Sequence, residues 1–234
     1  MKHSSFIAIA LCALIILSGC NMNNTTKGGL IGGGSGALIG GIVGNLIGKN
    51  AGGTAIGAAV GAAVGTGAGV LIGKKMDKAK AAAEAVKNAQ VESVTDNNGL
   101  QAVKVTFDNG ILFKVGKSDL QSTAQASLKQ FASSVLNVYT DCDVAICGYA
   151  SSDGNEDTNL TLSQNRANAV TNYLTGTCSV NKSQIKSTTG YGEDPQYLIK
   201  DANGKEDMAA SRRVEVYLYA SESMIKAAEA GTLQ

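Results

Sequence analysis

The sequence predicts an α+β fold: a βαβαβ sandwich with helices packed on one mixed sheet, preceded by a glycine-zipper helical hairpin. Two observations predict this class. Strand-like and helix-like patterns alternate between residues 101 and 221, and glycine recurs every four residues between positions 28 and 73. The first of these regions, about 120 residues long, is large enough to bury one hydrophobic core. We therefore expect one globular domain over residues 101–221.

The first 20 residues have the pattern of a secretory signal. Lys2 precedes an apolar run from Phe6 to Leu17, which is too short to span a membrane and ends in Leu-Ser-Gly-Cys at Cys20. This ending resembles bacterial lipoproteins, which are cleaved before a diacylated cysteine. We expect residues 1–19 to be a signal peptide, Cys20 to carry lipid, and residues 20–27 to form a lipidated tether. An ordinary secretory signal with an incidental cysteine is the alternative.

Residues 28–73 contain two ladders of glycine, which predict a helical hairpin. Four-residue spacing places glycine on one slowly drifting helical face and lets neighbouring helices approach closely. As helices, the uncharged segments 28–48 and 51–73 would each be roughly 31 to 34 Å long, enough to cross a hydrocarbon core. We expect this hairpin to associate with the membrane or to form a homo-oligomer; a flexible Gly/Ala spacer is the alternative. The ladder glycines stand at 28, 32, 36, 40, 44, 48 and 52, then at 53, 57, 61, 65, 69 and 73.

Residues 74–100 are expected to form a helical linker. The stretch from Lys74 to Ser93 is rich in alanine, a strong helix former, with interspersed Lys, Asp and Glu. Such a composition suits an exposed helix.

The domain begins with a hairpin-like pattern. QAVKVTF and ILFKV flank Asp108-Asn109-Gly110, which predicts two strands joined by a turn. A helix is expected over residues 123–138, because its apolar residues recur at helical spacing. These apolar residues are Ala124, Leu128, Phe131 and Val135.

The remaining elements continue the alternation. A strand, DVAICGY, is followed by a helix from about Leu162 to Leu174, whose apolar side faces the sheet. QIKSTTGYG and RRVEVYLY then supply two more strands. Residues 222–234 form a C-terminal tail that adds at most a short helix and has no assigned role.

The composition argues against several function classes. Removal of residues 1–19 takes away one of the 20 basic residues and leaves 19 Lys and Arg against 19 Asp and Glu. This balance gives no electrostatic case for nucleic acid. His3 is the only histidine and is also removed, which excludes histidine-based catalysis and metal binding. The sequence has no metal-ligand cluster, phosphate loop or nucleophile elbow, so we expect a non-enzymatic protein without a cofactor.

Three cysteines remain beyond the lipid site: Cys142, Cys147 and Cys178. Their spacing fits no common zinc pattern, and their compartment permits disulfides. If Cys142 begins a strand and Cys178 follows the helix that returns from it, the crossover brings both to one edge of the sheet. A Cys142–Cys178 disulfide is therefore as compatible with the sequence as two free thiols. Cys147 lies within a strand and is expected to be a buried thiol.

The segment from Gly148 to Leu174 carries the strongest functional signal. It consists of a strand end, a polar loop and a helix start that carries Arg166. Its pattern resembles the peptidoglycan-binding segment of OmpA-like C-terminal domains, whose helix reads Leu-Ser-x-x-Arg-Ala. The matching positions are Gly148, Gly154, Asn159, Leu162, Ser163, Arg166, Ala167 and Val170.

The resemblance extends to other parts of the chain. Residues 210–215, Ala-Ser-Arg-Arg-Val-Glu, resemble the Asn-Arg-Arg-Val-Glu terminal strand of the same family, with Ser211 in place of asparagine. A glycine-zipper region followed by an OmpA-like domain is similar to lipoproteins of the YiaD-like or peptidoglycan-associated type. The resemblance therefore implies an OmpA-like sandwich over residues 101–221.

The resemblance also implies a site for meso-diaminopimelate of the peptidoglycan stem. In the family an Asp after the strand and the Arg of the helix together hold this zwitterion, because its carboxylate suits a guanidinium and its ammonium suits a carboxylate. Arg166 lies one turn into the expected helix, near the positive end of the helix dipole, and preserves the first half. Ser151 stands at the position of the family's Asp.

Three interpretations of this substitution stay open. Asp153 reaches into the site from two residues later, Ser151 supplies a weaker neutral hydrogen bond, or the site no longer binds the wall. The candidate peptidoglycan-binding residues are Arg166, Ser151, Asp153, Asn159 and Leu162.

Two function hypotheses follow. In the first, the protein is an outer-membrane lipoprotein, anchored through Cys20 with its domain in the periplasm, that tethers the envelope to peptidoglycan. In the second, it is a structural or assembly protein whose glycine zipper drives membrane association or oligomerisation and whose domain binds a protein partner. A carboxylate from Asp153, Glu156 or Asp157 close to Arg166 would favour the first hypothesis, and a lone Arg166 the second.

Overall fold

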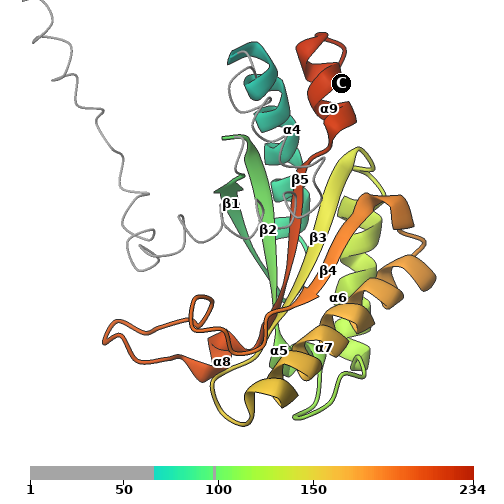
Figure 1. The fold of residues 1–234 in the computed structure, drawn as a ribbon. Coiled ribbons are helices and arrows are strands. Elements are labelled where there is room, and N and C mark those ends of the chain that lie inside the picture. Colours follow the sequence, from blue (N-terminus) through green and yellow to red (C-terminus); the bar gives the residue numbers. More distant parts are fainter. Residues whose placement is uncertain (1–65, 97–98) are drawn as a thin grey trace, which may run out of the picture. The chain divides into compact units, whose positions relative to one another are not determined.

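The computed structural model describes residues 66–96 and 99–234 (Figure 1). The signal peptide, the tether, Cys20 and most of the glycine zipper therefore lie outside the described residues. The elements in chain order are α4 (Thr66–Glu84), β1 (Ala89–Thr95), β2 (Gln101–Asp108), α5 (Asn109–Leu112), α6 (Ser122–Phe131), the π-helical turn η3 (Ala132–Leu136), β3 (Cys142–Tyr149), α7 (Glu156–Gly176), the 3-10 turn η4 (Lys182–Gln184), β4 (Ile185–Gly190), α8 (Met208–Ser211), β5 (Arg213–Ala220) and α9 (Glu222–Glu229).

The five strands form one mixed sheet in the order β1-β2-β5-β3-β4. β1, β2, β5 and β3 pair antiparallel with their neighbours, whereas β3 and β4 run parallel and are joined through α7. Parallel neighbours need such a crossover because a tight turn cannot join them. The predicted α+β class, with helices on one mixed sheet, is confirmed.

Strand periodicity divides the sheet into two faces. On β5, Val214, Val216 and Leu218 belong to the large core beneath the helices, and the alternate residues Tyr217 and Tyr219 belong to a second cluster. The large core also receives apolar side chains from α4, α6, α7 and α9, and Figure 1 shows these helices on one side of the sheet. This is the separation expected from the period of two along a strand.

The expected strand ILFKV is wrong, because these residues begin with the short helix α5. Asp108 caps this helix by accepting a hydrogen bond from the Gly110 amide at 2.6 Å. β2 already pairs with β1 on one side and β5 on the other, so it has no free edge for a hairpin partner. Leu112 and Phe113 are instead buried in the core.

The helical linker expected over residues 74–100 is only partly helical. α4 runs from Thr66 to Glu84 and therefore crosses the expected boundary between zipper and linker at residues 73 and 74. It is not an exposed helix, since Ile72, Met76 and Ala83 are fully buried. After α4 the chain forms β1, whose Val91 faces Val105 of β2. Pairing with the edge of β2 therefore outweighs the helix propensity of the alanine-rich sequence in residues 89–95.

The other expected elements are present with shifted ends. The helix expected over 123–138 is α6 followed by η3, and the tail does form a helix, α9. α7 begins six residues earlier than expected, at Glu156, because Asn155 caps it by accepting from the Thr158 amide at 3.2 Å. The expectation that Arg166 lies one turn into the helix, near the positive end of its dipole, is therefore wrong, since Arg166 lies in the middle of α7. Among the described helices, none is both long and apolar enough to cross a membrane.

The Cys142–Cys178 disulfide, which the sequence left as one of two possibilities, is not formed, because Cys142, Cys147 and Cys178 are all free thiols. Cys142 is buried in β3, and the charged groups that influence its thiol are Asp141, Lys75 and Asp143. Cys178 lies just beyond α7, where its thiol interacts with Tyr173. The crossover does return the chain to the same edge, but each thiol has its own surroundings. Cys147 is a buried thiol, as expected.

α7 lies unusually close to the parallel strands at two glycines. A Cβ built on Gly190 would lie 2.6 Å from Cα of Gln164, and one built on Gly148 would lie 3.1 Å from the carbonyl carbon of Ser163. Hydrogen bonds fix this contact: the Gly190 amide donates to Oε1 of Gln164 at 2.8 Å, and the Gly192 amide donates to Oγ of Ser163 at 2.9 Å. The helix therefore has one position on the sheet.

A buried ion pair stabilises the second face of the sheet near the start of β5. Nε of Arg213 lies 2.7 Å from Oε1 of Glu215, and the Tyr217 hydroxyl donates a hydrogen bond to the other carboxylate oxygen, Oε2, at 2.5 Å. Arg213 further donates to the carbonyls of Ser211 and Tyr197. Burial raises the pKa of Glu215, but Arg213, Lys104 and these hydrogen bonds outweigh burial and lower it below its ordinary value.

The Gly190→Ala variant should unfold more easily. Its methyl group would overlap the backbone of α7, and overpacking of this kind costs about 1–3 kcal/mol or more. The midpoint of urea denaturation should fall accordingly. Gly176→Ala is the matched control, because nothing lies within 4 Å of the added Cβ there, and it should keep or raise the midpoint. Equal midpoints for Gly190→Ala and wild type would contradict the close contact.

Glu215→Gln should lower stability in a pH-dependent way. At pH 7 the change leaves the buried Arg213 without its carboxylate, which costs about 3–5 kcal/mol. The pKa of Glu215 is lowered in the folded state, so its contribution is full above about pH 4.3 and is lost as the pH falls through the folded value. Denaturation curves of variant and wild type should therefore converge in acid. Glu92→Gln, which removes an exposed partner of Lys104, should change stability by less than about 1 kcal/mol at any pH.

Candidate functional site

The candidate site lies at one end of the sheet, where the loop from β3 to α7 meets the segment before β5. α5, α8 and the start of α7 gather at this end in Figure 1. The loop spans residues 150–155 and follows β3, at the edge of the sheet where the carboxyl ends of the parallel strands β3 and β4 lie, a common place for ligands in α/β folds. Gly154 in this loop has a φ of +113°, a backbone conformation that residues with a side chain rarely adopt.

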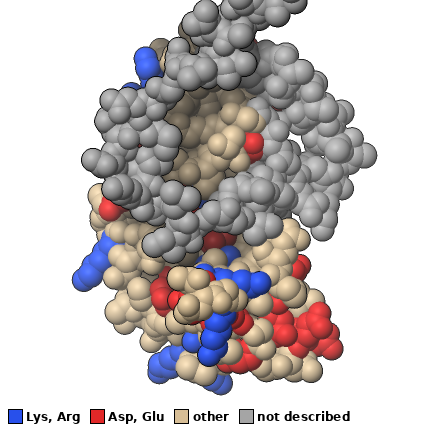
Figure 2. Space-filling model, turned by 90° about the vertical axis from the view of Figure 1, so that its left-hand side faces the viewer, with Lys and Arg blue, Asp and Glu red and all other residues tan. Residues whose placement is uncertain are grey.

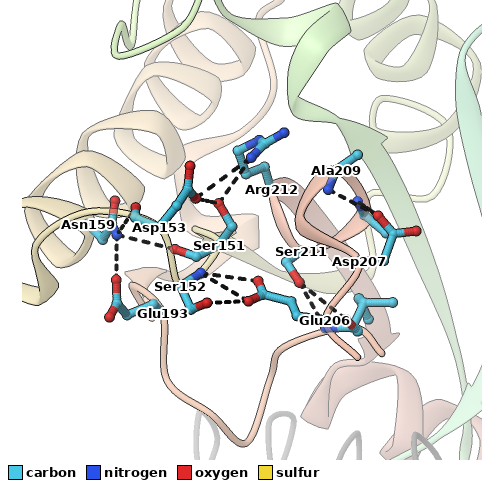
Figure 3. A network of polar contacts seen from close by, with 12 residues as sticks. Ser151, Ser152, Asp153, Asn159, Glu193, Glu206, Asp207, Ala209, Ser211 and Arg212 are labelled. Atoms are coloured by element: carbon cyan, nitrogen blue, oxygen red, sulfur yellow. Dashed lines mark hydrogen bonds and ion pairs between the residues drawn. The ribbon is translucent and has the colours of Figure 1, made fainter. Parts of the chain in front are cut away.

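Asn159 fixes the shape of the loop. Its Nδ2 donates to the carbonyl of Ser151 at 3.2 Å and to that of Asp153 at 3.0 Å, and also to the carboxylate of Glu193 (Figure 3). The side chain is buried. Asn159 therefore positions the backbone of the candidate loop, and its amide hydrogens are already used.

Ser151 and Asp153 form a small network with Arg212, the residue before β5. The Ser151 hydroxyl donates to the carboxylate of Asp153 and accepts from Nη1 of Arg212 at 3.2 Å. Nη1 of Arg212 also lies 3.7 Å from Asp153 (Figure 3). The hydrogen bond from Ser151, and then the charge of Arg212, lower the pKa of Asp153. The carboxylate is therefore ionised and paired.

Arg166 lies apart from this carboxylate. Only 2% of the residue is exposed, its Nε donates to the Lys117 carbonyl at 3.0 Å, and its guanidinium lies over the Phe113 ring at 5.4 Å from the ring centre. Burial, and secondarily the nearby charge of Arg212, lower the pKa of Arg166 to about 10. Within residues 66–96 and 99–234, neither Asp153, Glu156 nor Asp157 forms an ion pair with Arg166.

Leu162 lies one turn before Arg166 and is half-buried. It lines a shallow depression of about 380 Å³ on α7 together with Asp157, Thr158, Thr161 and Asn165. A larger hollow of about 510 Å³ is lined by Lys114, Lys117, Asp119, Leu120, Gln121 and Ser122. Lys117 is the one lining residue of this hollow that contacts Arg166, through its backbone carbonyl; Arg166 itself does not line the hollow.

The segment between β4 and α8 forms hydrogen bonds with the loop of residues 150–155. Glu206 accepts hydrogen bonds from the amide and the hydroxyl of Ser152 (Figure 3). Ser211, at the position where the family has asparagine, accepts from the Ile199 amide at 3.0 Å. Asp207 caps α8 by accepting from the Ala209 and Ala210 amides. The segment that ends in Arg212 is therefore held in place by its own hydrogen bonds.

Sequence reasoning assigned no site role to Arg212 and Lys117. A signal for Arg212 was present, because it belongs to the Ser-Arg-Arg stretch that resembles the family's terminal strand. The contact of Lys117 with Arg166 could not be predicted from the sequence, because any residue type has the backbone carbonyl that makes it. Of the expected residues, the structure brings Ser151, Asp153 and Asn159 into one network, whereas Arg166 contacts Lys117 and Phe113 instead.

The described residues offer no metal site. Across them, no group of three or more His, Cys, Asp or Glu side chains is placed to hold a metal ion. On the face drawn in Figure 2, acidic side chains gather at the lower right of the described part, and basic side chains lie in its middle and at its lower left.

Comparison with known proteins gives two family matches and several relatives. Residues 112–212 match the OmpA family, and residues 1–77 match the YMGG-like Gly-zipper family; neither is a family of enzymes. Probable lipoprotein YiaD of Escherichia coli (strain K12) is 33% identical over 114 residues, which cover 49% of this chain and 50% of that protein. Outer membrane protein P5 of Haemophilus influenzae is 36% identical over 95 residues, which cover 40% of this chain and 26% of that protein.

The chain thus spans between a quarter and a half of the length of these two curated relatives. Among solved structures, the periplasmic domain of MotB from Helicobacter pylori is similar with a TM-score of 0.48 and 16% identity, over 63% of this chain and 88% of that one. The resemblance inferred from the sequence is confirmed, since residues 112–212 match the OmpA family and residues 1–77 match the YMGG-like Gly-zipper family.

Proposed function

We propose that this protein is a lipid-anchored outer-membrane protein whose OmpA family domain binds peptidoglycan non-covalently and so tethers the envelope to the cell wall. The domain would lie in the periplasm, with Arg166 holding a carboxylate of the stem peptide. The family match over residues 112–212 supports a wall-binding role. The protein would act by binding alone, without catalysis.

One observation supports an anionic ligand at this site: Arg166 is a buried cation with no carboxylate partner among the described residues. By the criterion given from the sequence, this lone arginine favours the protein-partner function, and it is the family match over residues 112–212 that carries the wall-binding proposal. It is 2% exposed, and burial lowers its pKa while leaving it charged at neutral pH. Removing a charge from water without an ion-pair partner is costly. A bound carboxylate would relieve this cost and could form a bidentate pair with the guanidinium. The site is therefore arranged for an anionic ligand.

The fixed setting of Arg166 strengthens the case for a ligand. Its Nε is held by the Lys117 carbonyl, its guanidinium lies against Phe113, and α7 cannot shift because of the contacts at Gly148 and Gly190. A guanidinium held in one geometry loses little conformational entropy when it binds. This preorganisation is typical of a recognition residue.

The anchor and the zipper complete the proposal. The relatives include a lipoprotein and an outer membrane protein by name, and Cys20 ends a lipoprotein-like signal. Acyl chains on Cys20 would hold the chain in the outer membrane, and the glycine zipper would associate with the membrane or with other copies. No cofactor is required for this function.

A second function is favoured by a different aspect of the same site. Because Asp153 pairs with Arg212 and not with Arg166, the acid–base pair that suits zwitterionic diaminopimelate is incomplete. In the alternative, the domain binds a carboxylate of a protein partner, and the zipper drives assembly. The sacculus experiment below separates the two functions.

Arg166→Ala should abolish binding to the cell wall. One charge-assisted hydrogen bond contributes about 1.5–3 kcal/mol, so loss of the guanidinium should weaken binding at least about 10-fold. The full-length chain in detergent is incubated with purified sacculi, and the pelleted fraction is measured. Arg166→Lys keeps the charge but not the planar fork and should bind at an intermediate level.

Lys182→Ala, which removes an exposed cation after α7, serves as the control and should pellet like wild type. Thermal melting of each variant distinguishes lost binding from lost folding. If folded Arg166→Ala pellets like wild type, Arg166 has no role in wall binding; if wild type itself stays in the supernatant, the protein-partner function gains.

Cys20→Ser should release the protein from the membrane. The substitution removes the sulfur that would carry the diacylglycerol, and without acyl chains only the zipper could retain the chain. Incorporation of labelled palmitate should disappear and the protein should move to the soluble fraction of the envelope. Cys147→Ser, a buried thiol far from the signal in sequence, should keep the label. Persistent labelling of Cys20→Ser would contradict the anchor.

A further inference from the structure

We propose that the second arm of the glycine zipper, residues 51–73, does not cross the membrane. It extends α4 into water and holds the domain with its candidate site turned away from the lipid. This inference rests on the proposed lipid anchor, because it concerns how the anchored chain carries its domain. The part of the arm that lies in α4, residues 66–73, carries the argument.

The described end of the arm belongs to the core of the domain. Ala68, Ile72 and Met76 recur every four residues along α4, are buried and belong to the large core. α4 packs against β1, β2 and α9. The apolar side chains that a bilayer would have to hold in the last two turns of the arm are therefore already buried in protein.

Two polar contacts fix the height of α4 on the sheet. Nζ of Lys75 lies 2.6 Å from the carboxylate of Asp141, which precedes β3. Nε2 of Gln101, the first residue of β2, donates to the Asp77 carboxylate at 2.6 Å. α4 then continues along the sheet to β1, so its first turns, residues 66–72, project beyond the end where β2 and β3 begin (Figure 1).

α9 keeps lipid away from these first turns. It follows β5 at the same end of the sheet, lies beside α4 and buries its apolar residues in the same core (Figure 1). Its outer side carries Glu222, Lys226 and Glu229, and the first two form an exposed ion pair. Hydrocarbon that reached Ile72 would also surround these charges, which is costly. The residues of α4 are therefore not available to the bilayer.

The rest of the arm is too short to span a membrane. Without the residues of α4, only residues 51–65 remain, and a helix of that length is about 22 Å long. The hydrocarbon core of a bilayer is about 30 Å thick, and a spanning helix needs about 20 residues. Lys49 and Asn50, at the expected turn of the hairpin, prevent an extension upstream.

An apolar arm outside the bilayer needs a helix to pack against. The stripe that α4 buries continues upstream at the same four-residue spacing, as Val64, Val60 and Ile56. The first glycine ladder has this spacing too and ends at Gly48, just before the expected turn. Glycine lets two such helices approach closely, so the hairpin can cover its own stripe in water.

The direction of α4 determines which way the candidate site faces. α4 projects from the end of the sheet where β2 and β3 begin and β5 ends, whereas the loop of residues 150–155 follows β3 at the opposite end (Figure 1). β3 has 8 residues and separates the two ends by about 26 Å. A domain held through α4 therefore presents its candidate site on the side farthest from the lipid.

A cysteine scan tests whether the arm crosses the membrane. Each residue from 51 to 65 is replaced in turn by cysteine in the full-length acylated chain, which also carries Cys178→Ser because Cys142 and Cys147 are buried. The chains are reconstituted in vesicles of phosphatidylethanolamine and phosphatidylglycerol, and a charged thiol reagent is added. Reaction rates are divided by that of Lys78→Cys, on the exposed side of α4.

We expect fast and slow positions to alternate with a period of three to four residues, as on a helix with one face in water. Protection of every position would show that the arm lies in the bilayer. Fast reaction at every position would show that α4 has no helical extension. Either result would overturn the inference.

Energy transfer to a dye on the vesicle lipid tests the orientation of the domain. The donor is attached to Val115→Cys, next to the contact of Lys117 with Arg166, or to Glu229→Cys on α9, both exposed positions. Transfer from Val115→Cys should be much weaker, because the length of the sheet separates the two positions. Equal transfer, or stronger transfer from Val115→Cys, would contradict the proposed orientation.

Cys20→Ser separates this inference from the proposed anchor. Without acyl chains and without a spanning arm, this chain should stay at the bottom of a density gradient in which vesicles float. If it floats with the vesicles, the arm inserts by itself and the inference is wrong, while the proposed anchor and wall binding stand. If wild type incorporates no palmitate, the anchor is wrong, and a chain that does not float still supports an arm outside the bilayer.

Discussion

The close contact between α7 and the parallel strands determines the rest of this structure. Gly148 and Gly190 allow the helix backbone to approach β3 and β4 more closely than any side chain would permit. The polar side chains of Ser163 and Gln164 then reach the amides of Gly192 and Gly190. Because backbone groups on both sides are involved, rotation or translation of the helix would break several hydrogen bonds at once. Arg166 and Asn159 take their positions from this contact.

The electrostatics of the site follow from which charges are paired within it. Arg213 and Glu215 neutralise each other inside the second face, so β5 can bring a further arginine, Arg212, to the loop without an uncompensated neighbour. Arg212 in turn neutralises Asp153. Among the described residues of the site, Arg166 is then the cation that has no carboxylate partner. A site with one surplus buried cation favours an anion, whatever the rest of the ligand carries.

Much of the fold was readable from the sequence because its signals are local. The periodicity of β3, α6, α7 and β5 and the Asp-Asn-Gly break after β2 all correspond to ends or faces of real elements. The failures came from long-range effects. ILFKV could not pair as a strand because β1 occupied the available edge of β2, and residues 89–95 became that edge strand despite their alanine-rich neighbourhood. The Cys142–Cys178 disulfide failed because proximity of two chain ends does not fix the direction of two thiols.

The same contrast between local signals and long-range contacts applies to the site. Arg166, Ser151 and Asn159 could be named because they lie in one contiguous stretch, but no sequence pattern could show that Arg212 would bind the side chain of Asp153. That pair bears directly on function, since it removes the carboxylate that would complete a zwitterion site. A weaker individual site is compatible with the proposed tethering, because a lipid anchor on Cys20 would hold each domain near the wall, where many copies could engage it together.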